Sequence, residues 1–353
     1  MTERPLMSET IELDDSPEAV DDYFAAHQWS DGLPVVPPTE ERVRAMLAAV
    51  RRDPQESLGA MPPGWGQATV EKLAINAVMA GCRPAYFPVI LAAVDAMLDP
   101  AFNLYGVQAT THPVAPLLVV SGPYVRAIDM HVGSGVLGPG NRANATIGRA
   151  MRLILLNVGA GWPGRGDMAT QGSPAKYSYV IAENEAASPW EPLRVALGFA
   201  AEETAVTVFG GEGPHNVNDH VSTTATGILT NCADVMVPIG SNVGWYFSQS
   251  QLMLVLGPEH AATVAKDGLD RADVQRFCYH QARRTLGKAK LGGMYGIQDW
   301  PRWMQVIGDD ATPLPLVPSP EDIFVLVAGG PGKHSVVVPN CTFSRAVTRA
   351  VDV

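Results

Sequence analysis

The stretch GSGVLGPGNRANATIGRAMRLILLNVG, residues 133–159, organises our interpretation of this sequence. Its second half places apolar side chains on one face of a helix, at Ile147, Met151, Ile154, Leu155 and Val158. The backbone amides of a glycine-rich loop, a helix N-terminus and an arginine side chain all favour a small anion. We therefore predict that Asn141, Arg142 and Asn144 bind substrate at the start of this helix. The alternative is a plain glycine turn with Arg142 in a structural ion pair.

The glycines of this loop have the spacing of a dinucleotide-binding motif but not its context. Gly133, Gly135 and Gly138 match GxGxxG, yet the dipeptide at 139–140 separates them from the helix. The motif also needs an acidic residue about 20 positions further on, where this chain has Val158. No Gly-Lys-Ser/Thr follows, so the loop is not a Walker A motif either. We expect no nucleotide cofactor.

Composition bounds the class of protein and its partners. The chain has 353 residues, enough for one large or two ordinary domains. Its 25 Lys and Arg against 36 Asp and Glu give a net charge of −11, which disfavours nucleic acid or an anionic membrane as partner. No apolar run reaches the roughly 20 residues of a membrane span.

Cysteine usage and the start of the chain point to the cytoplasm. The four cysteines are scattered and form no CxxC pair: Cys82, Cys232, Cys278 and Cys341. This pattern disfavours a disulfide scaffold or a thiolate zinc site and suits a reducing compartment. The first residues are acidic and polar, unlike a secretory signal. We expect a cytoplasmic protein.

The order of helical and strand patterns predicts an α/β class of mixed α+β type, helix-rich, with short strands that lead into glycine-rich loops. Helices are predicted over 17–24, 40–51, 69–97 with a break at 82–84, and 223–236; strands over 116–120, 125–132, 205–209, 252–256 and 322–328. The polar stretch 162–188 is too long for a simple connection, and such loops are often functional.

Three regions follow from these patterns. We predict a flexible tail over 1–16, a substrate-binding region of glycine loops and helices over 17–240, and a smaller α/β region over 241–353. The alternative is a single interleaved domain.

The densest group of metal-capable side chains is PHNVNDH, which contains His215, Asp219 and His220. Two imidazoles and a carboxylate can hold a divalent ion such as zinc. A further ligand would come from elsewhere in the chain: His112, His131 or His334. The spacing matches no standard metal signature. The alternatives are that His215 or His220 moves protons or contacts substrate, since imidazole titrates near neutrality, or only bonds the loop.

Two further places carry candidate chemistry. GGPGKHS, residues 329–335, follows a predicted strand, where ligands of α/β sheets bind. We predict that Lys333 and Ser335 bind substrate and that His334 is catalytic; the alternative is a surface hairpin. Cys82 lies at a helix break, where a helix N-terminus and Arg83 would lower its pKa, so it is a candidate nucleophile. Buried packing is the alternative.

Several phrases together resemble the bacterial proteins grouped with the UGSC (seleno)protein family. They are DGLPVVPPTEERV, VEKLAINAVMAGCRPAYFPVILAAV, GPGNRANATIGRAMRL, SPWEPL and AGGPGKHS, and the resemblance runs from Asp31 to Arg349. The family is named after a Sec/Cys-Gly-Ser-Cys motif, which this chain lacks. The resemblance therefore implies the companion component that occurs with the motif-bearing part, with Cys82 and the loops at Arg142 and Lys333 as pocket walls.

The hypothesis that follows is an enzyme or enzyme subunit that binds a small polar or anionic substrate and cleaves a C–X bond. Cleavage would be reductive with a thiol or selenol partner protein, or eliminative or hydrolytic without one. One alternative is a metal-dependent hydrolase or lyase built on the histidine cluster. Another is a non-catalytic partner of a redox protein. The alanine- and glycine-rich helices at 69–97 and 143–159 also suggest a homodimer or other homo-oligomer.

Overall fold

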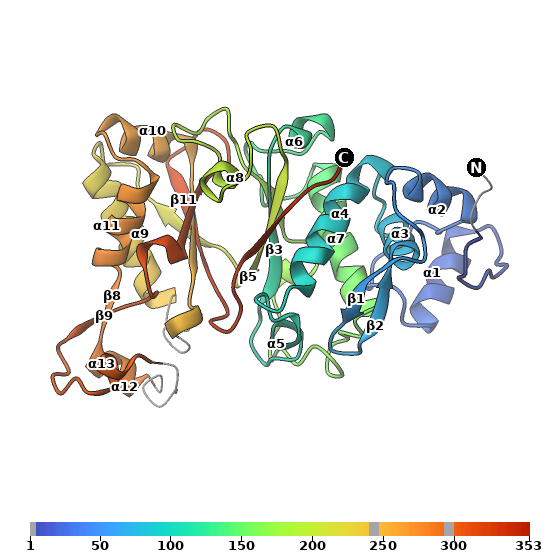
Figure 1. Ribbon diagram of the computed structural model, residues 1–353, viewed down its shortest axis with the longest axis horizontal. Helices are drawn as coiled ribbons and strands as arrows, with labels where there is room; N and C mark the ends of the chain where they lie inside the picture. Colours follow the sequence, from blue (N-terminus) through green and yellow to red (C-terminus); the bar gives the residue numbers. More distant parts are fainter. Residues whose placement is uncertain (1–4, 240–246, 293–299) are drawn as a thin grey trace.

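The computed structural model describes residues 5–239, 247–292 and 300–353. Within them, two four-stranded β-sheets lie face to face, and helices cover the outer face of each sheet (Figure 1). About 37% of the chain is helical and 18% is in strands. The predicted mixed α+β class is confirmed.

The first sheet has the strand order β12-β5-β3-β4. Its strands are β3 (Ala115–Ser121), β4 (Val180–Ala182), β5 (Ala205–Gly211) and β12 (Val347–Ala350). β3 runs parallel to β4 and antiparallel to β5, which is antiparallel to β12. The helices α4 (Phe87–Leu98) and α7 (Arg142–Asn157) cover its outer face, and α3 (Val70–Met79) packs against them on the side away from the sheet (Figure 1).

The second sheet has the order β10-β7-β11-β6. Its strands are β6 (His215–Asn218), β7 (Leu252–Leu256), β10 (Ile323–Val327) and β11 (His334–Pro339). β7 and β10 are parallel, and β11 is antiparallel to both β7 and β6. The helices on its outer face are α9 (Ala225–Ile239), α10 (Pro258–Lys266) and α11 (Arg271–Gln281).

Alternation along the strands builds a separate core on each face of a sheet. In β3, Leu117 belongs to the apolar cluster between the sheets, whereas Leu118 belongs to the cluster under the helices. Phe209 of β5 meets Phe324 of β10 edge to face across the sheets, with ring centroids 6.0 Å apart. Burial on both faces explains why residues 115–121 are almost wholly apolar.

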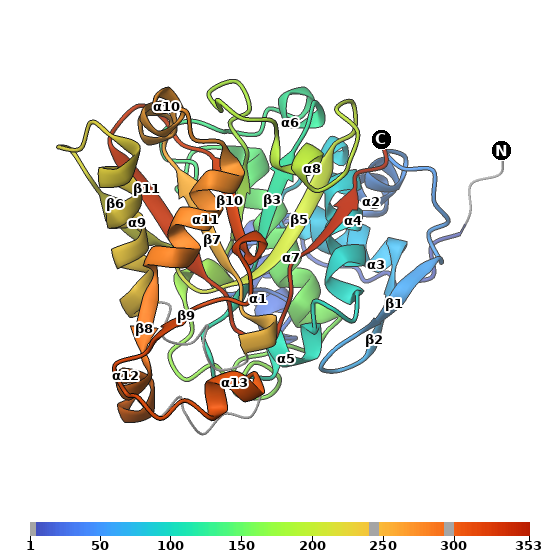
Figure 2. The same cartoon turned by 60° about the vertical axis from the view of Figure 1, so that its left-hand side comes forward.

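The chain passes between the two layers twice. It leaves β5 for β6 over residues 211–215 and leaves β11 for β12 over 339–347, and a bridge pairs Gly211 with Asn340 at the crossing. Figure 2 shows β11 and β12 at opposite ends of this connection. The predicted boundary near residue 240 falls in 240–246, outside the described residues.

The remaining helices and strands belong to neither four-stranded sheet. They are α1 (Pro17–Ala26), α2 (Glu40–Leu47), β1 (Ser57–Met61), β2 (Gly66–Thr69), α5 (Leu104–Gln108), α6 (Tyr124–Ala127), α8 (Leu193–Ala196), β8 (Arg283–Thr285), α12 (Leu286–Leu291), α13 (Arg302–Gln305) and β9 (Pro313–Pro315). Ser16 caps α1, because its side chain accepts a hydrogen bond from the Ala19 amide.

The strand predicted over 125–132 is wrong, because this segment begins with the helical turn α6. Val125 and Ile128 are both buried, and a spacing of three suits one helical turn as well as an apolar strand. Asp129 then takes a left-handed conformation (φ 55°), which ends the turn. An apolar run this short does not distinguish the period of a strand from that of a helical turn.

Residues 6–8 are anchored, although the sequence predicts a flexible tail over 1–16. The backbone amides of Met7 and Ser8 donate to the buried carboxylate of Glu71 on α3. These hydrogen bonds lower the pKa of Glu71, although its burial acts in the opposite direction. Leu6 packs against the main core.

The alanine-rich faces of α3 and α4 are buried inside the chain. Ala74, Ala77, Ala93 and Ala96 are all fully buried in the core around the first sheet. Small residues here allow helices to pack closely within one subunit. These faces therefore give no support to the predicted homodimer.

Helix α7 has the predicted apolar stripe, and all five of its residues are buried. On a neighbouring face, Gly148 lies directly against the chain at residues 178–179. A β-carbon at position 148 would lie 2.3 Å from Ser178 Oγ and 2.8 Å from the backbone nitrogen of Tyr179. Only glycine fits this approach.

We expect Gly148→Ala to destabilise the protein by about 1–3 kcal/mol, because the added carbon overpacks the contact. Helix propensity alone predicts the opposite sign, a gain of about 1 kcal/mol. Denaturant unfolding measures the difference. Ala145→Gly, at an exposed position of α7, is the control and should cost about 1 kcal/mol. A Gly148→Ala variant as stable as the wild type would contradict the close approach.

Candidate functional site

The polar side chains of the glycine-rich loop bind the chain's own backbone. Asn141 caps α7: its side chain accepts from the Asn144 amide at 3.0 Å and donates to the carbonyl of Asp129 at 2.7 Å. Asn144 exchanges hydrogen bonds of 2.9 and 3.0 Å with the backbone of His131. Both side chains therefore hold the loop in its conformation. Few of their polar atoms remain available to bind the predicted substrate.

Arg142 and Cys82 are also committed to structural contacts. Arg142 Nε and Nη2 donate to the carbonyl of Gly81 at 3.0 and 2.9 Å, which ties α7 to the turn after α3. Cys82 is buried and donates to the carbonyl of Thr146 at 3.2 Å. Burial raises the pKa of its thiol to about 12. A nucleophile must be a thiolate, so the structure argues against the predicted catalytic role of Cys82.

The two predicted glycine loops do come together, but not at their charged residues. The Gly329 amide donates to the carbonyl of Val132 at 2.8 Å, and a β-carbon at Gly330 would overlap Ser134. Arg142 takes no part in this contact.

Around β6 and β11 the predicted residues divide between surface and interior. His220 and His334 are exposed, and their Nε2 atoms lie 3.1 Å apart. Lys333 Nζ donates to the carbonyl of His220 at 3.2 Å. Ser335 is buried, accepts from the Gly257 amide and bonds His260 Nδ1, so a substrate cannot reach it.

Asp219 is a structural carboxylate. It accepts from the amides of Val221 and Ser222 at 3.1 and 2.8 Å and from Asn231 Nδ2 at 2.6 Å. Burial alone would raise its pKa, but these hydrogen bonds lower the pKa to about 2. His215 is exposed on β6, opposite Val337. In the part of the chain that the structure describes, no three His, Cys, Asp or Glu residues are arranged to hold a metal ion.

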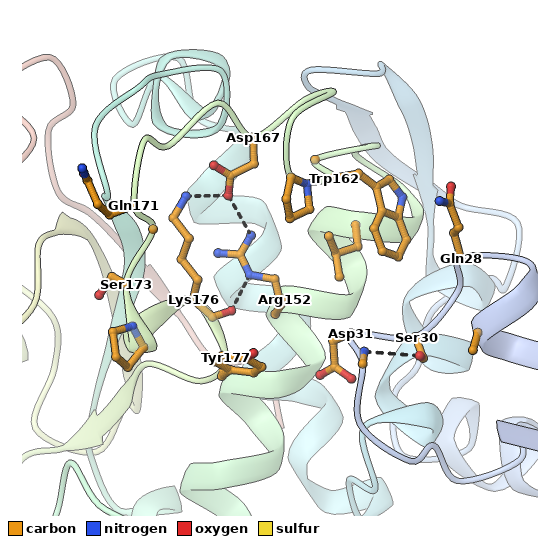
Figure 3. A pocket seen from close by; sticks show the side chains of 17 residues that line it. Gln28, Ser30, Asp31, Arg152, Trp162, Asp167, Gln171, Ser173, Lys176 and Tyr177 are labelled. Carbon is orange, nitrogen blue, oxygen red and sulfur yellow. Dashed lines mark hydrogen bonds and ion pairs between the residues drawn. The ribbon is translucent and has the colours of Figure 1, made fainter. Parts of the chain in front are cut away.

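A cavity of about 690 Å³ opens elsewhere, between α1, α7 and the loop at 161–177 (Figure 3). Its lining residues come from four segments: Ala25, Gln28, Ser30, Asp31 and Gly32; Arg152 and Leu156; Gly161, Trp162, Pro163 and Asp167; and Gln171, Gly172, Ser173, Pro174, Lys176 and Tyr177. A concave site of this size with a few convergent polar groups suits a small molecule.

Three charged side chains converge on one wall of this cavity. Asp167 is buried, and its Oδ2 binds Lys176 Nζ at 2.5 Å and lies 3.9 Å from Arg152 Nη1. Arg152 Nε donates to the carbonyl of Lys176 at 2.6 Å. Figure 3 shows the lysine and the guanidinium on either side of the carboxylate. Burial lowers the pKa of both cations, and Asp167 opposes this shift in each.

The cluster carries one more positive charge than negative. Asp31 also lines the cavity, but Arg149 binds both of its carboxylate oxygens at 2.8 Å. Among the described residues, the Nη atoms of Arg152 make only the 3.9 Å ion pair, so they have unused donors. The arrangement therefore favours an anion.

Arg149 also fixes the opposite wall. Besides Asp31, its Nη2 donates to the carbonyls of Leu33 and Pro34 at 3.1 and 2.8 Å. Asn157 Nδ2 donates to the carbonyl of Trp29 at 2.9 Å, about two turns further along α7. The extended loop at 31–39 is thus held against the helix by side chains of α7.

The sequence singles out the loop at 162–188 but assigns no role to the charged residues of the cavity. Arg152 had a signal, since it interrupts an apolar run and a buried arginine needs a partner. Lys176 and Asp167 had none, because nine residues of loop separate them and only the folded path brings them together.

Neither a protein-family model nor a curated protein matches this chain. None of the helices in the described ranges is long and apolar enough to cross a membrane. The resemblance to the UGSC family stays a prediction.

We expect Asp219→Asn to lower the free energy of unfolding at pH 7 by about 1–2 kcal/mol, because hydrogen bonds to a charged acceptor are lost. The carboxylate stabilises the fold above its ordinary pKa of 3.8, and this contribution disappears as pH falls towards 2. The gap between wild type and variant should therefore close between about pH 4 and pH 2.

Urea unfolding across this pH range measures the gap. Asp234→Asn, at an exposed position of α9, is the matched control and should have little effect. A gap that stays constant down to pH 2 would contradict the role given to Asp219.

Proposed function

We propose that this chain is an enzyme subunit that binds a small organic anion in the cavity beside α7 and takes part in cleaving a C–X bond of that molecule. The observation that carries the proposal is the pair of cations, buried Arg152 and partly buried Lys176, which share the single carboxylate of Asp167 on the cavity wall. Buried charges cost stability, so an incompletely neutralised cluster at a cavity is a candidate ligand site.

The walls suggest the chemical class of the anion. Leu156, Trp162 and Pro174 line the cavity with apolar surface, whereas Arg152 and Lys176 offer charged donors on one side. A small carboxylate with an apolar body fits this division better than inorganic phosphate does. The carboxylate would bind the guanidinium, and the apolar body would lie against the indole.

Lys176 is our candidate for proton transfer. Its pKa is lowered by burial, which brings an ammonium closer to the range in which it can act as acid or base. It could protonate a leaving group or remove a proton next to the bound carboxylate. Ser173 and Tyr177 lie near it on the cavity lining.

The resemblance to the UGSC family supports a role beside a thiol or selenol protein. All four cysteines of this chain are buried, so reductive cleavage would need a thiol from that partner. A metal-dependent hydrolase or lyase at the histidine cluster, and a non-catalytic partner of a redox protein, are the alternative proposals. The cavity favours neither.

The first test is ligand binding. We expect saturation-transfer NMR to detect short carboxylates such as propionate and benzoate, and Arg152→Met to weaken binding about tenfold or more. Asp167→Asn raises the charge of the cluster by one and should tighten binding, which separates a charge effect from misfolding. Arg165→Met, at an exposed position on the same loop and outside the cavity lining, is the control. Equal binding by all variants would contradict the site.

The second test separates binding from proton transfer. Lys176→Arg keeps the positive charge, but arginine does not give up its proton. We expect it to retain carboxylate binding and to lose turnover of a panel of organic acids with dithiothreitol, followed by mass spectrometry. Wild-type binding should weaken as pH rises through the lowered pKa of Lys176, below the ordinary 10.5, because the ammonium loses its charge. Full turnover by Lys176→Arg would remove the lysine from the mechanism.

A further inference from the structure

Two imidazoles face one another on the half of the molecule away from the cavity. His220 follows β6, and His334 is the first residue of β11, where it pairs with Asn218. Their Nε2 atoms are 3.1 Å apart, and the rings are nearly perpendicular, at 79°. Figure 1 places β11 beside α9 and α10, with α1 and α7 beyond the first sheet. The proposed function does not use this pair.

The hydrogen bonds around the pair define its tautomers. His334 Nδ1 lies 2.9 Å from Asn216 Oδ1, and an amide oxygen can only accept, so Nδ1 carries the proton. The Nε2 atom of His334 therefore presents a lone pair. His220 Nε2 must then donate the proton of the 3.1 Å contact. Holding the far ring nitrogen in this way is how proteins orient histidines that bind metal.

The spacing of the two nitrogens also fits a metal ion. Zinc–imidazole bonds of about 2.0–2.1 Å at a tetrahedral angle put two ligand nitrogens about 3.3–3.4 Å apart. The observed 3.1 Å differs from this by only a few tenths of an ångström. Both histidines are exposed, so an ion can enter from solvent and small ring movements are free.

We propose that His220 and His334 form a two-imidazole site for a divalent first-row transition ion such as Zn²⁺, bound through both Nε2 atoms. The ion replaces the hydrogen bond, and the proton on His220 Nε2 moves through solvent to Nδ1 of the same ring. No third His, Cys, Asp or Glu joins the pair among the described residues, so water fills the other positions. Imidazole selects zinc, nickel or copper over magnesium or calcium.

This ligand set differs from the one that the sequence suggests. His334 takes the place of His215 and Asp219 as a ligand. The carboxylate oxygens of Asp219 already accept three hydrogen bonds. Lys333 lies next to the pair, with Nζ on the carbonyl of His220, and its positive charge opposes a cation. Lys333→Met should therefore tighten metal binding, whereas the loss of either imidazole should weaken it.

The test is calorimetric titration of the full chain with ZnCl₂ and, separately, MgCl₂. We expect one zinc ion per chain, no magnesium binding, and at least a tenfold loss of zinc affinity in His334→Ala and in His220→Ala. His215→Ala, at an exposed position of β6, is the matched control and should bind as the wild type does. Circular dichroism checks that each variant is folded.

A second measurement reports the ligands directly. Electron paramagnetic resonance of added Cu²⁺ should show coupling to two imidazole nitrogens in the wild type and in His215→Ala, and loss of the two-nitrogen signal in His334→Ala. The proposal is overturned if the wild type binds no zinc. It is also overturned if His215→Ala weakens binding as much as His334→Ala, since that result would support the set His215, Asp219 and His220.

Discussion

The contacts made by one face of helix α7 are the constraint on which the cavity depends. Gly148 admits the chain at 178–179, Arg149 binds the loop at 31–34, and Arg152 holds Lys176 and lies beside Asp167. These positions follow one another at helical spacing, so a single rigid element fixes the walls of the cavity. The apolar stripe of the same helix is buried in the core, which fixes the rotation of the helix about its own axis.

The hydrophobic core packs against the apolar face of this helix. Strands of the first sheet are buried on both faces, by α4 and α7 on one side and by the second sheet on the other. The chain exchanges strands between the sheets, since β12 returns to the first layer after β11 has completed the second. The two layers are thereby joined through backbone pairing as well as side-chain packing.

Taking the charged cluster of the cavity out of water costs free energy. Arg152 and Asp167 are buried and Lys176 is partly buried, and the pKa of each cation falls because burial disfavours the charged form. A hydrophobic replacement of such a group is often neutral or stabilising, so stability alone does not explain its presence. The histidine pair costs little by comparison, because both rings are exposed.

The sequence by itself determined the local elements whose signals are short-range. The apolar stripe of α7, the cap at Ser16, and the apolar strands β3, β7 and β10 depend on residues a few positions apart, and all are present. The strand predicted at 125–132 is wrong because a spacing of three between apolar residues suits a helical turn too.

Only the tertiary structure decided which polar groups are free. Asn141, Arg142 and Asn144 look like ligands in the sequence but bind backbone groups of the chain itself. His334 meets His220, 114 positions earlier in the sequence, and Lys176 meets Asp167, nine positions earlier in an irregular loop. Neither kind of contact leaves a periodic pattern in the sequence, so only the fold determines it.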